Sequence, residues 1–295
     1  MSSTESKKGI ILIFLSAVMF GSYGMWSRLI GSSHGVFYPG WTRSLIICLI
    51  LTPIVVYTKQ VVAIKKEDYK WMVVFLGVTS LTQAPLFYAF NHMDIGTATL
   101  LFFVTMLLTM YSIGYLFLAE KLNKIKIASF FIAMIGLSII FKSSIVTFSF
   151  FAAFMAVVNG VASGGEIAFS KKLSGKYSSL FLIWLSWIAI TITNAIISLA
   201  IGEIQYIPQL SMYWMYQVLY AIAGILGFWL VVEGMKHVEA SVGGLLGLLE
   251  IVFSLLFGFI VFHQGITPKV LMGGIFIIIA AAIPHIVDLV EYKNI

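Results

Sequence analysis

The sequence has few charged residues and a single cysteine. Only 10% of its 295 residues are charged and 60% are hydrophobic, whereas soluble domains carry about 25% charged residues. A soluble core of this length cannot enclose so much apolar surface, which excludes a soluble enzyme, a nucleic-acid-binding module and a disordered tail. Cys48 stands alone in an apolar segment, so the chain cannot form an internal disulfide or a cysteine-based metal site. We expect Cys48 to be a small buried hydrophobic residue.

Several motifs of soluble chemistry are also missing. The sequence contains no Gly-rich phosphate loop of the GxxxxGK[ST] type, so this chain has no ATP motor of that kind. It contains no Asp-rich motif of the kind that binds a metal diphosphate. The five histidines are scattered near the ends of the apolar stretches, a position more typical of interfacial residues than of metal ligands. We therefore expect no cofactor and no metal.

Long apolar stretches dominate what remains, and the mean hydropathy is +1.03. A membrane-crossing helix needs about 20 apolar residues. The sequence predicts an all-α integral membrane protein with a short tail at residues 1–8 and ten transmembrane helices. The predicted helices span residues 9–28, 37–58, 71–91, 95–118, 125–142, 148–169, 178–201, 211–233, 240–262 and 268–288. Pro53, Pro85 and Pro284 lie inside these spans, and we expect them to bend the helices.

The lysines predict an orientation. If residues 1–8 are cytoplasmic, nearly all lysines fall on the cytoplasmic side, and the opposite side holds only Arg28, Lys142 and Lys269, with Arg43 just inside the second span. This bias follows the positive-inside rule and places both termini in the cytoplasm. The net charge of +6 and the pI of 9.2 then reflect topology and anionic lipid, and nucleic acid is not needed to explain them.

The two halves of the chain resemble each other at a spacing of about 144 residues. Met93–Gly96 begins the fourth predicted span and Val238–Ser241 begins the ninth, while Ala119–Asn123 matches His263–Thr267. We therefore predict a first five-helix repeat over residues 9–142 and a second over residues 148–290. Because five is odd, the second repeat enters from the opposite side, and the repeats are inverted around a central cavity. Transporters often have this symmetry, although a channel or a membrane enzyme could share it.

These features resemble the EamA-type family of the drug/metabolite transporter superfamily over residues 9–290. Its members end an apolar helix in Leu-Gly-Glu-Arg/Lys-Leu, which matches Leu118–Leu122, and contain Leu-Glu-Pro-Val-Phe, which matches Leu249–Phe253. They usually carry an arginine in an aromatic setting, as in Trp41–Arg43. The sequence departs from the family where Met106 and Ile251 replace helical prolines and Gln264 replaces the second terminal glutamate.

The resemblance implies ten helices, a central cavity and alternating access for a small metabolite. Known members mostly export amino acids, amines or other metabolites from bacteria, which implies a bacterial inner (cytoplasmic) membrane. The family motifs specify the fold better than the substrate. The transported metabolite, the direction of transport, the coupling ion and the choice between monomer and homodimer stay open at this point.

Two carboxylates inside predicted spans are candidate site residues, one near the middle of the ninth span and one in the cytoplasmic half of the sixth. A charge at the bilayer centre costs about 2.5–3.5 kcal/mol on insertion scales. Glu250 shares a helical stripe with Gly243, Gly247, Ser254 and Gly258, and small residues on a stripe indicate contact with protein. We expect it to face inward and to bind a substrate amine or carry a coupling proton. The alternative is a neutral glutamic acid hydrogen-bonded between helices.

The second carboxylate, Glu166, lies on a polar stripe with Asn159, Ser163 and Ser170. It has the same two possible functions as Glu250. Its alternative is a local ion pair with Lys171 or Lys172, about one turn further along the helix.

Other side chains complete the candidate site. An aromatic cavity with carboxylates suits a cationic or zwitterionic substrate, because ring faces attract ammonium groups. Arg43 is a candidate gating residue, or else it extends to the membrane interface. Glu233 is expected to pair with Lys236. The remaining substrate-binding candidates are Tyr23, Gln83, Tyr88, Thr105, Asn159, Trp184 and Tyr220, and Thr105 is the expected repeat partner of Glu250.

The sequence thus favours a secondary transporter, without ATP, of a small polar metabolite such as an amino acid, an amine or a quaternary ammonium compound. Proton coupling through Glu250 or Glu166 is part of this hypothesis. The alternative from another class is an integral membrane enzyme or lipid-handling protein with an intramembrane carboxylate. It would need a convergent catalytic cluster, which the sequence does not contain, so we do not expect an enzyme. A sensor or assembly partner is a third possibility.

Overall fold

The computed structural model describes residues 3–31, 33–141 and 149–293, and these residues form helices and no strand. The first repeat contains α1 (Ser3–Gly21), α2 (Tyr23–Ile30), α3 (Tyr38–Tyr57), the short 3-10 helix η1 (Lys66–Asp68), α4 (Tyr69–Thr79), α5 (Ala84–His92), α6 (Ile95–Phe117) and α7 (Lys124–Phe141). The second contains α8 (Phe150–Ser174), α9 (Ser179–Ala200), α10 (Met212–Met235), α11 (Ala240–Gly247), α12 (Leu249–Phe262) and α13 (Pro268–Lys293).

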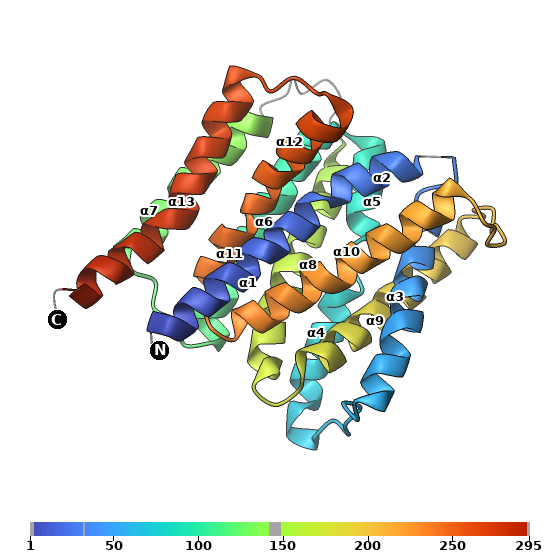
Figure 1. Cartoon of the computed structure of the whole chain (residues 1–295), viewed down its shortest axis with the longest axis horizontal. Helices are drawn as coiled ribbons and strands as arrows, with labels where there is room; N and C mark the ends of the chain where they lie inside the picture. Colours follow the sequence, from blue (N-terminus) through green and yellow to red (C-terminus); the bar gives the residue numbers. More distant parts are fainter. Residues whose placement is uncertain (1–2, 32, 142–148, 294–295) are drawn as a thin grey trace.

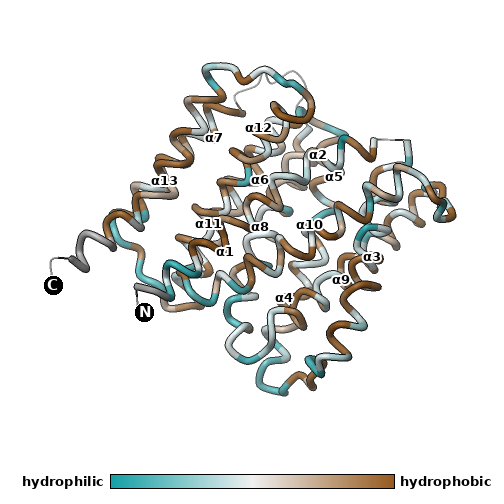
Figure 2. The backbone as a smooth tube through the Cα atoms, in the orientation of Figure 1, coloured by the Kyte–Doolittle hydropathy of each residue, from teal (hydrophilic) through white to brown (hydrophobic). Residues whose placement is uncertain are grey.

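The helices follow the ten predicted spans in order, and three of the spans are each divided into two helices. Nine helical segments of the described chain are long and apolar enough to cross a membrane, and α13 adds a shorter apolar stretch, Pro268–Pro284. Hydropathic colouring follows the same division, with hydrophobic residues along the helices and hydrophilic residues gathered at the turns (Figure 2). The chain is therefore a multi-pass membrane protein. The predicted boundary between the repeats, at residues 142–148, lies outside the described residues.

The helix contacts repeat in a symmetric way. Helix α7 packs on its repeat partner α13 at one edge of the bundle, and α3 packs on its partner α9 at the other (Figure 1). The contacts of α1 with α10 and with α11–α12 recur as contacts of α8 with α4–α5 and with α6. The repeats therefore pack on each other through equivalent surfaces.

Both self-paired sets run antiparallel. In α3 and α9, Gly40 near the start of α3 lies beside Asn194 near the end of α9. Thr52, further along α3, accepts a hydrogen bond from Trp184, which is nearer the start of α9. In α7 and α13, Gly136 lies beside Ile277, whereas Ile140 lies beside Gly273. A two-fold axis that relates antiparallel partners is perpendicular to the helices, so the two repeats are inverted.

The same turn ends the fourth helix of each repeat. Ala119 and His263 both adopt left-handed backbone, with φ of 55° and 52°. The next residue donates its N–H to a glycine carbonyl six residues earlier, from Glu120 to Gly114 at 3.0 Å and from Gln264 to Gly258 at 3.2 Å. The spacing of about 144 residues seen in the sequence is thus matched by local geometry.

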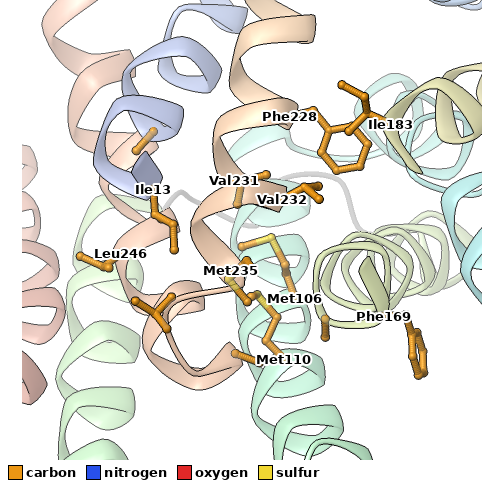
Figure 3. Close-up of a cluster of buried hydrophobic side chains, with 14 of the residues drawn as sticks. Ile13, Met106, Met110, Phe169, Ile183, Phe228, Val231, Val232, Met235 and Leu246 are labelled. Atoms are coloured by element: carbon orange, nitrogen blue, oxygen red, sulfur yellow. The ribbon is translucent and has the colours of Figure 1, made fainter. Parts of the chain in front are cut away.

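Methionines and small residues form the tightest parts of the core. Met106, Met110 and Met235 meet between α6 and α10 among buried aliphatic side chains (Figure 3). Helix α6 approaches α8 so closely that a Cβ on Gly164 would overlap the Met106 carbonyl. Such close packing of small residues drives helix association where lipid removes the hydrophobic effect. Cys48 is buried, as predicted.

Three membrane spans are interrupted near the middle of the bundle. The break between α1 and α2 falls at Ser22, that between α4 and α5 at residues 80–83, and that between α11 and α12 at Leu248. Pro85 stands at the start of α5, whereas Pro53 and Pro284 lie inside uninterrupted helices.

Each broken span has a continuous repeat partner, namely α8, α10 and α6 respectively. The break at Leu248 needs no proline: Ile251 donates to the Leu248 carbonyl at 3.0 Å, a local 3-10 turn. Mid-helix turns of this type often mark hinges.

Candidate functional site

The breaks of two spans meet at Glu250. A Cβ on Gly21 would lie 2.6 Å from the Cβ of Phe253 and 2.8 Å from the Glu250 carbonyl oxygen, so α1 and α12 touch backbone to backbone there. Tyr23 follows directly after this contact and lies within electrostatic range of Arg43, Glu166 and Glu250. Interrupted helices around a central polar group are the usual construction of a transporter binding site.

Arg43, on α3, has its guanidinium enclosed by aromatic rings. The guanidinium carbon lies 4.1 Å from the ring centre of Tyr220, 5.3 Å from that of Tyr23 and 5.8 Å from that of Trp187. The residue is only 4% exposed, which excludes the alternative in which it extends to the membrane interface. Ring faces cover the planar cation, and its edge N–H groups are the part suited to bidentate binding of an anion.

Donor groups around Arg43 lack acceptors. Among the described residues, the Nε of Arg43, the Nε1 of Trp187 and the hydroxyl of Tyr23 are buried without a hydrogen-bond partner. Gly224 on α10 brings two of them together, because a Cβ there would lie 3.0 Å from the Tyr23 hydroxyl and 3.5 Å from the Trp187 ring. Buried donors without partners cost about 1–3 kcal/mol each, so this cluster favours an anionic or acceptor ligand.

Glu250 is the second residue of α12 and lies within electrostatic range of Tyr23. Its side chain is half-buried, and a Cβ on Gly247, one turn earlier, would meet nothing within 4 Å. Within the described part of the chain, no ion pair joins Glu250 or Glu166 to Arg43. Glu250 therefore offers an accessible carboxylate beside open space.

Glu166, on α8, is more enclosed than Glu250. Thr79 from the end of α4 and Ser186 from α9 are the polar groups that face its carboxyl. None of the three closes a hydrogen bond of good geometry with a described residue, since Oε1 of Glu166, Oγ1 of Thr79 and Oγ of Ser186 are all buried without a partner. The expected alternative, an ion pair with Lys171, is wrong, because Lys171 pairs with Glu120 at 2.6 Å.

Two further candidates line the α4–α5 break. Asn159 is fully buried and donates from Nδ2 to the Leu81 carbonyl at 3.1 Å, while its Oδ1 has no described partner. Gln83, at the start of α5, accepts from Asn194 at 3.5 Å. A polar track thus runs from Glu166 along the break.

Three candidates lie elsewhere. Thr105 bonds to the Leu101 carbonyl of its own helix at 2.7 Å, in the α6–α8 contact. Tyr88 stacks on His92 at 3.9 Å. Trp184 donates to Thr52 at 2.9 Å in the α3–α9 contact. The structure does not bring these three side chains to Arg43 or the carboxylates.

The sequence interpretation missed Trp187, Ser186 and Thr79. Trp187 lies one turn beyond Trp184 on α9 and faces Arg43 instead. Ser186 and Thr79 are single hydroxyl residues inside apolar runs. Only the adjacent pair Ser186–Trp187 offered a signal, a polar group beside an aromatic one in an otherwise aliphatic segment.

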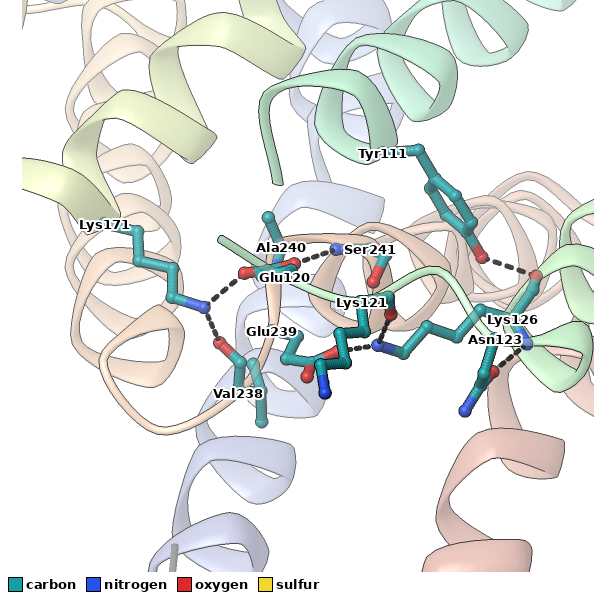
Figure 4. A network of polar contacts seen from close by, with 10 residues as sticks. All are labelled: Tyr111, Glu120, Lys121, Asn123, Lys126, Lys171, Val238, Glu239, Ala240 and Ser241. Atoms are coloured by element: carbon teal, nitrogen blue, oxygen red, sulfur yellow. Dashed lines mark hydrogen bonds and ion pairs between the residues drawn. The ribbon is translucent and has the colours of Figure 1, made fainter. Parts of the chain in front are cut away.

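A polar network closes the bundle at the end where α6 and α8 finish, here called the Glu120 end (Figure 4). Glu120, from the first repeat, pairs with Lys171 and accepts the Ala240 N–H at 2.7 Å, so it caps α11 of the second repeat. Lys126 pairs with Glu239 beside it.

The same end carries two further ion pairs. A 2.6 Å hydrogen bond to Asp68 raises the pKa of Lys176 above its usual value. Glu233 pairs with Lys236 at 2.6 Å, as predicted.

A different carboxylate closes the opposite end, here called the Glu203 end. Glu203 accepts the N–H groups of Val36 at 2.6 Å, Phe37 at 3.0 Å and Tyr38 at 2.7 Å, which caps the start of α3. Gln264, the repeat counterpart of Glu120, donates its backbone N–H to the Gly258 carbonyl and has no hydrogen bond to α6 among the described residues. The two ends are therefore closed by unrelated networks.

Comparisons with known proteins agree with this architecture. The sequence model of the EamA-like transporter family matches residues 7–142 and 150–283, one match for each repeat. No curated protein matches. A solved structure described as "Crystal structure of protein" matches with a TM-score of 0.77 and 13% identity, over 93% of this chain and 97% of that one, which shows the fold alone. The chain belongs to the EamA-like transporter family.

Proposed function

We propose that this protein is a secondary transporter of a small zwitterionic metabolite, such as an amino acid, and that it works by alternating access coupled to protons. The substrate carboxylate binds at Arg43, Trp187 and Tyr23, and its ammonium group binds at Glu250. This assignment treats Arg43 as a substrate ligand as well as a gating candidate. It is a transport function, without a catalytic or lipid-modifying step.

One observation carries this assignment. Arg43 and Glu250 both lie within electrostatic range of Tyr23, yet no ion pair joins them in the described part of the chain. The buried guanidinium of Arg43 has no counter-charge among the described residues, and an unpaired charge away from water costs several kcal/mol. A ligand with one negative and one positive group supplies both partners at once, whereas an amine or an acid alone supplies one.

Alternating access is supported by the two closed ends. The Glu120 network joins the end of α6 to α8 and α11, and the Glu203 network joins the end of α9 to the start of α3. The three helix breaks lie between these two ends. A substrate can reach Arg43 and Glu250 only if one network opens at a time. The breaks at Ser22, residues 80–83 and Leu248 are the hinges that such a motion would use.

The lysines support an orientation for this cycle. Lys121, Lys126, Lys171, Lys172 and Lys176 all lie at or next to the Glu120 end. By the positive-inside rule this end faces the cytoplasm, in a bacterial inner membrane, with both termini inside.

Ligand-induced thermal stabilisation of the detergent-purified protein tests the substrate class. The ligands are matched trios: an amino acid, the amine obtained by removing its carboxylate, and the acid obtained by removing its ammonium group. We expect only the complete zwitterion to raise the melting temperature, by mass action. Arg43→Gln and Glu250→Gln should each abolish the shift. An equal shift by the amine alone, retained in Arg43→Gln, would contradict the proposal.

A further inference from the structure

Glu166 is more deeply enclosed by neighbouring helices than Glu250 is. It is 9% exposed, and its two polar neighbours, Thr79 and Ser186, are 0% exposed. Glu250, by contrast, is half-buried beside the open space at Gly247. Glu166 is therefore the carboxylate that a bulky substrate group reaches least easily.

No cation among the described residues neutralises Glu166. The two nearest basic residues on its own helix are used elsewhere: Lys171 pairs with Glu120, and Lys172 donates to the Phe117 carbonyl at 2.9 Å. Arg43 pairs with neither glutamate.

The elements packed against Glu166 offer no other counter-charge. Helices α9 and α11 contain no titratable residue, and those of α4, Tyr69 and Lys70, lie at its far end. Tyr111 of α6 faces α7, where its hydroxyl donates to the Lys126 carbonyl at 2.9 Å. In α5, Tyr88 stacks on His92, the last residue of that helix. The other titratable residues of α6 and α10 lie toward the helix ends: Tyr115 in α6, and Tyr213, Tyr216 and Glu233 in α10. Tyr23, which lies within electrostatic range of Glu166 and packs edge-on against Tyr220, completes the surroundings.

The charge balance of the centre leaves room for one more cation. Two carboxylates and one guanidinium lie around Tyr23. In the proposed complex, Arg43 is matched by the substrate carboxylate and Glu250 by the substrate ammonium group. Glu166 then remains as an unmatched negative charge in a place where such a charge is costly.

We propose that Glu166 is the proton-carrying residue of the transport cycle and that Glu250 is reserved for the substrate. This inference rests on the proposed function and assigns separate tasks to its two carboxylates. A protonated Glu166 donates its O–H to one neighbouring hydroxyl and accepts from the other, which gives all three unpartnered groups a partner. An ionised Glu166 has no charge partner, so it must be hydrated when its pocket opens to water.

The pocket suits a proton better than a metal ion. The Glu166 carboxyl and the Thr79 and Ser186 hydroxyls supply four side-chain oxygens, whereas hard metal cations such as calcium and magnesium take six or more ligands. The Val78 and Thr79 carbonyls at the end of α4 already accept the N–H groups of Leu81 and Thr82. Sodium would therefore lack ligands that the proton does not need.

Two assays in liposomes separate coupling from translocation. The first measures exchange of a radiolabelled mixture of protein amino acids at equal pH on both sides, and the second measures accumulation of the same mixture driven by a pH gradient. For the wild type we expect both, with about tenfold accumulation per pH unit at one proton per substrate. Failure of wild-type exchange would contradict the proposed transport of amino acids. Exchange without pH-driven accumulation would overturn proton coupling and the role of Glu166, and it would leave the substrate assignment in place.

Glu166→Gln is the decisive variant, because it keeps the shape of the side chain and removes the titration. We expect it to retain exchange and to lose pH-driven accumulation, while Glu250→Gln loses both. Glu5→Gln, which alters an exposed carboxylate in the first turn of α1, is the control and should behave as the wild type. Thr79→Val and Ser186→Ala should shift the pH at which accumulation is half-maximal, and they serve as the readout if Glu166→Gln does not fold. Full pH-driven accumulation in Glu166→Gln, or drive by a sodium gradient in place of a pH gradient, would overturn the inference.

Discussion

At the scale of single residues, Arg43 is the side chain whose chemistry is hardest to replace. A guanidinium is flat, so it can lie on Tyr220 at 4.1 Å and still present two N–H groups along its edge. A lysine ammonium is compact and cannot do both. The binding site therefore depends on the shape of this cation as well as on its charge.

We predict that Arg43→Lys weakens amino acid binding about tenfold to hundredfold, the equivalent of one charged hydrogen bond. Arg28→Lys is a matched control, since Arg28 also lies over an aromatic ring, Phe262 at 4.3 Å, but on the exposed part of α2. The Arg28→Lys variant should bind amino acids as tightly as the wild type does. Dissociation constants from equilibrium binding to the purified proteins decide the matter, and similar losses in both variants would contradict a special role for Arg43.

The sequence predicts these side chains only in part. Glu250 and Glu166 stand out because charge is rare in apolar spans, and Tyr23 and Tyr220 because they lie deep within them. Thr79, Ser186 and Trp187 give no such signal, since hydroxyl and aromatic residues are common in membrane helices. Their role depends on three different helices meeting at one point, which no local pattern specifies.

At the scale of helices, the contact between α6 and α8 is the closest in the fold. Gly160 and Gly164 of α8 lie directly against the α6 backbone. Close contact of this kind replaces the hydrophobic effect as the source of helix association in lipid. It also holds Glu166, two residues beyond Gly164, at a fixed depth.

Gly164→Ala should lower the melting temperature of the purified protein markedly. A Cβ there overlaps the Met106 carbonyl, and overpacking costs about 1–3 kcal/mol. Gly77→Ala on α4 is the control, because a Cβ at that exposed helical position meets nothing within 4 Å. It should leave the melting temperature unchanged or raise it slightly. Equal effects of the two substitutions would show that the α6–α8 contact is not as tight as described.

The helix breaks mark the limit of prediction at this scale. Ten spans follow from hydropathy, and their repeat from matched segments. The interruption at Leu248 does not follow from the sequence, because the family proline is Ile251 here and the turn forms without it. The repeat partner of the α11–α12 span is the continuous helix α6, which has Met106 at its own family proline position. Both spans lack the proline, so its absence does not explain why only one of them is broken.

Glu120 is predicted to hold the Glu120 end closed. Glu120→Gln removes its charge from Lys171 and weakens the cap on α11, which should favour opening at this end. We expect a cysteine placed at Gly247, in a Cys48→Ser background, to react at least about tenfold faster with a membrane-impermeant maleimide added from the Glu120 side. Gln264→Ala at the opposite end should leave the rate unchanged. An unaltered rate in Glu120→Gln would show that this network is not a gate.

At the scale of the whole molecule, the features that the two inverted repeats share and the features in which they differ have separate consequences for transport. The repeats share their packing and their helix-end turns, which produces two similar halves able to rock about the centre. The repeats differ in charge, because Glu120 of the first repeat has the neutral Gln264 as its counterpart. They also differ in helix continuity, because each broken span has a continuous partner. The two closed ends are thus held by different interactions, so their opening can respond to different conditions.

The most direct test of the central claim is counterflow across a liposome membrane. Vesicles containing the protein are loaded with an unlabelled amino acid and diluted into a trace of the same labelled compound, beside vesicles loaded with its amine or its acid. Our account predicts transient accumulation of label only with the zwitterion inside, and none in Arg43→Gln or Glu250→Gln. Accumulation that is equally strong with the amine, or that persists in both variants, would contradict the claim that one zwitterion binds between Arg43 and Glu250.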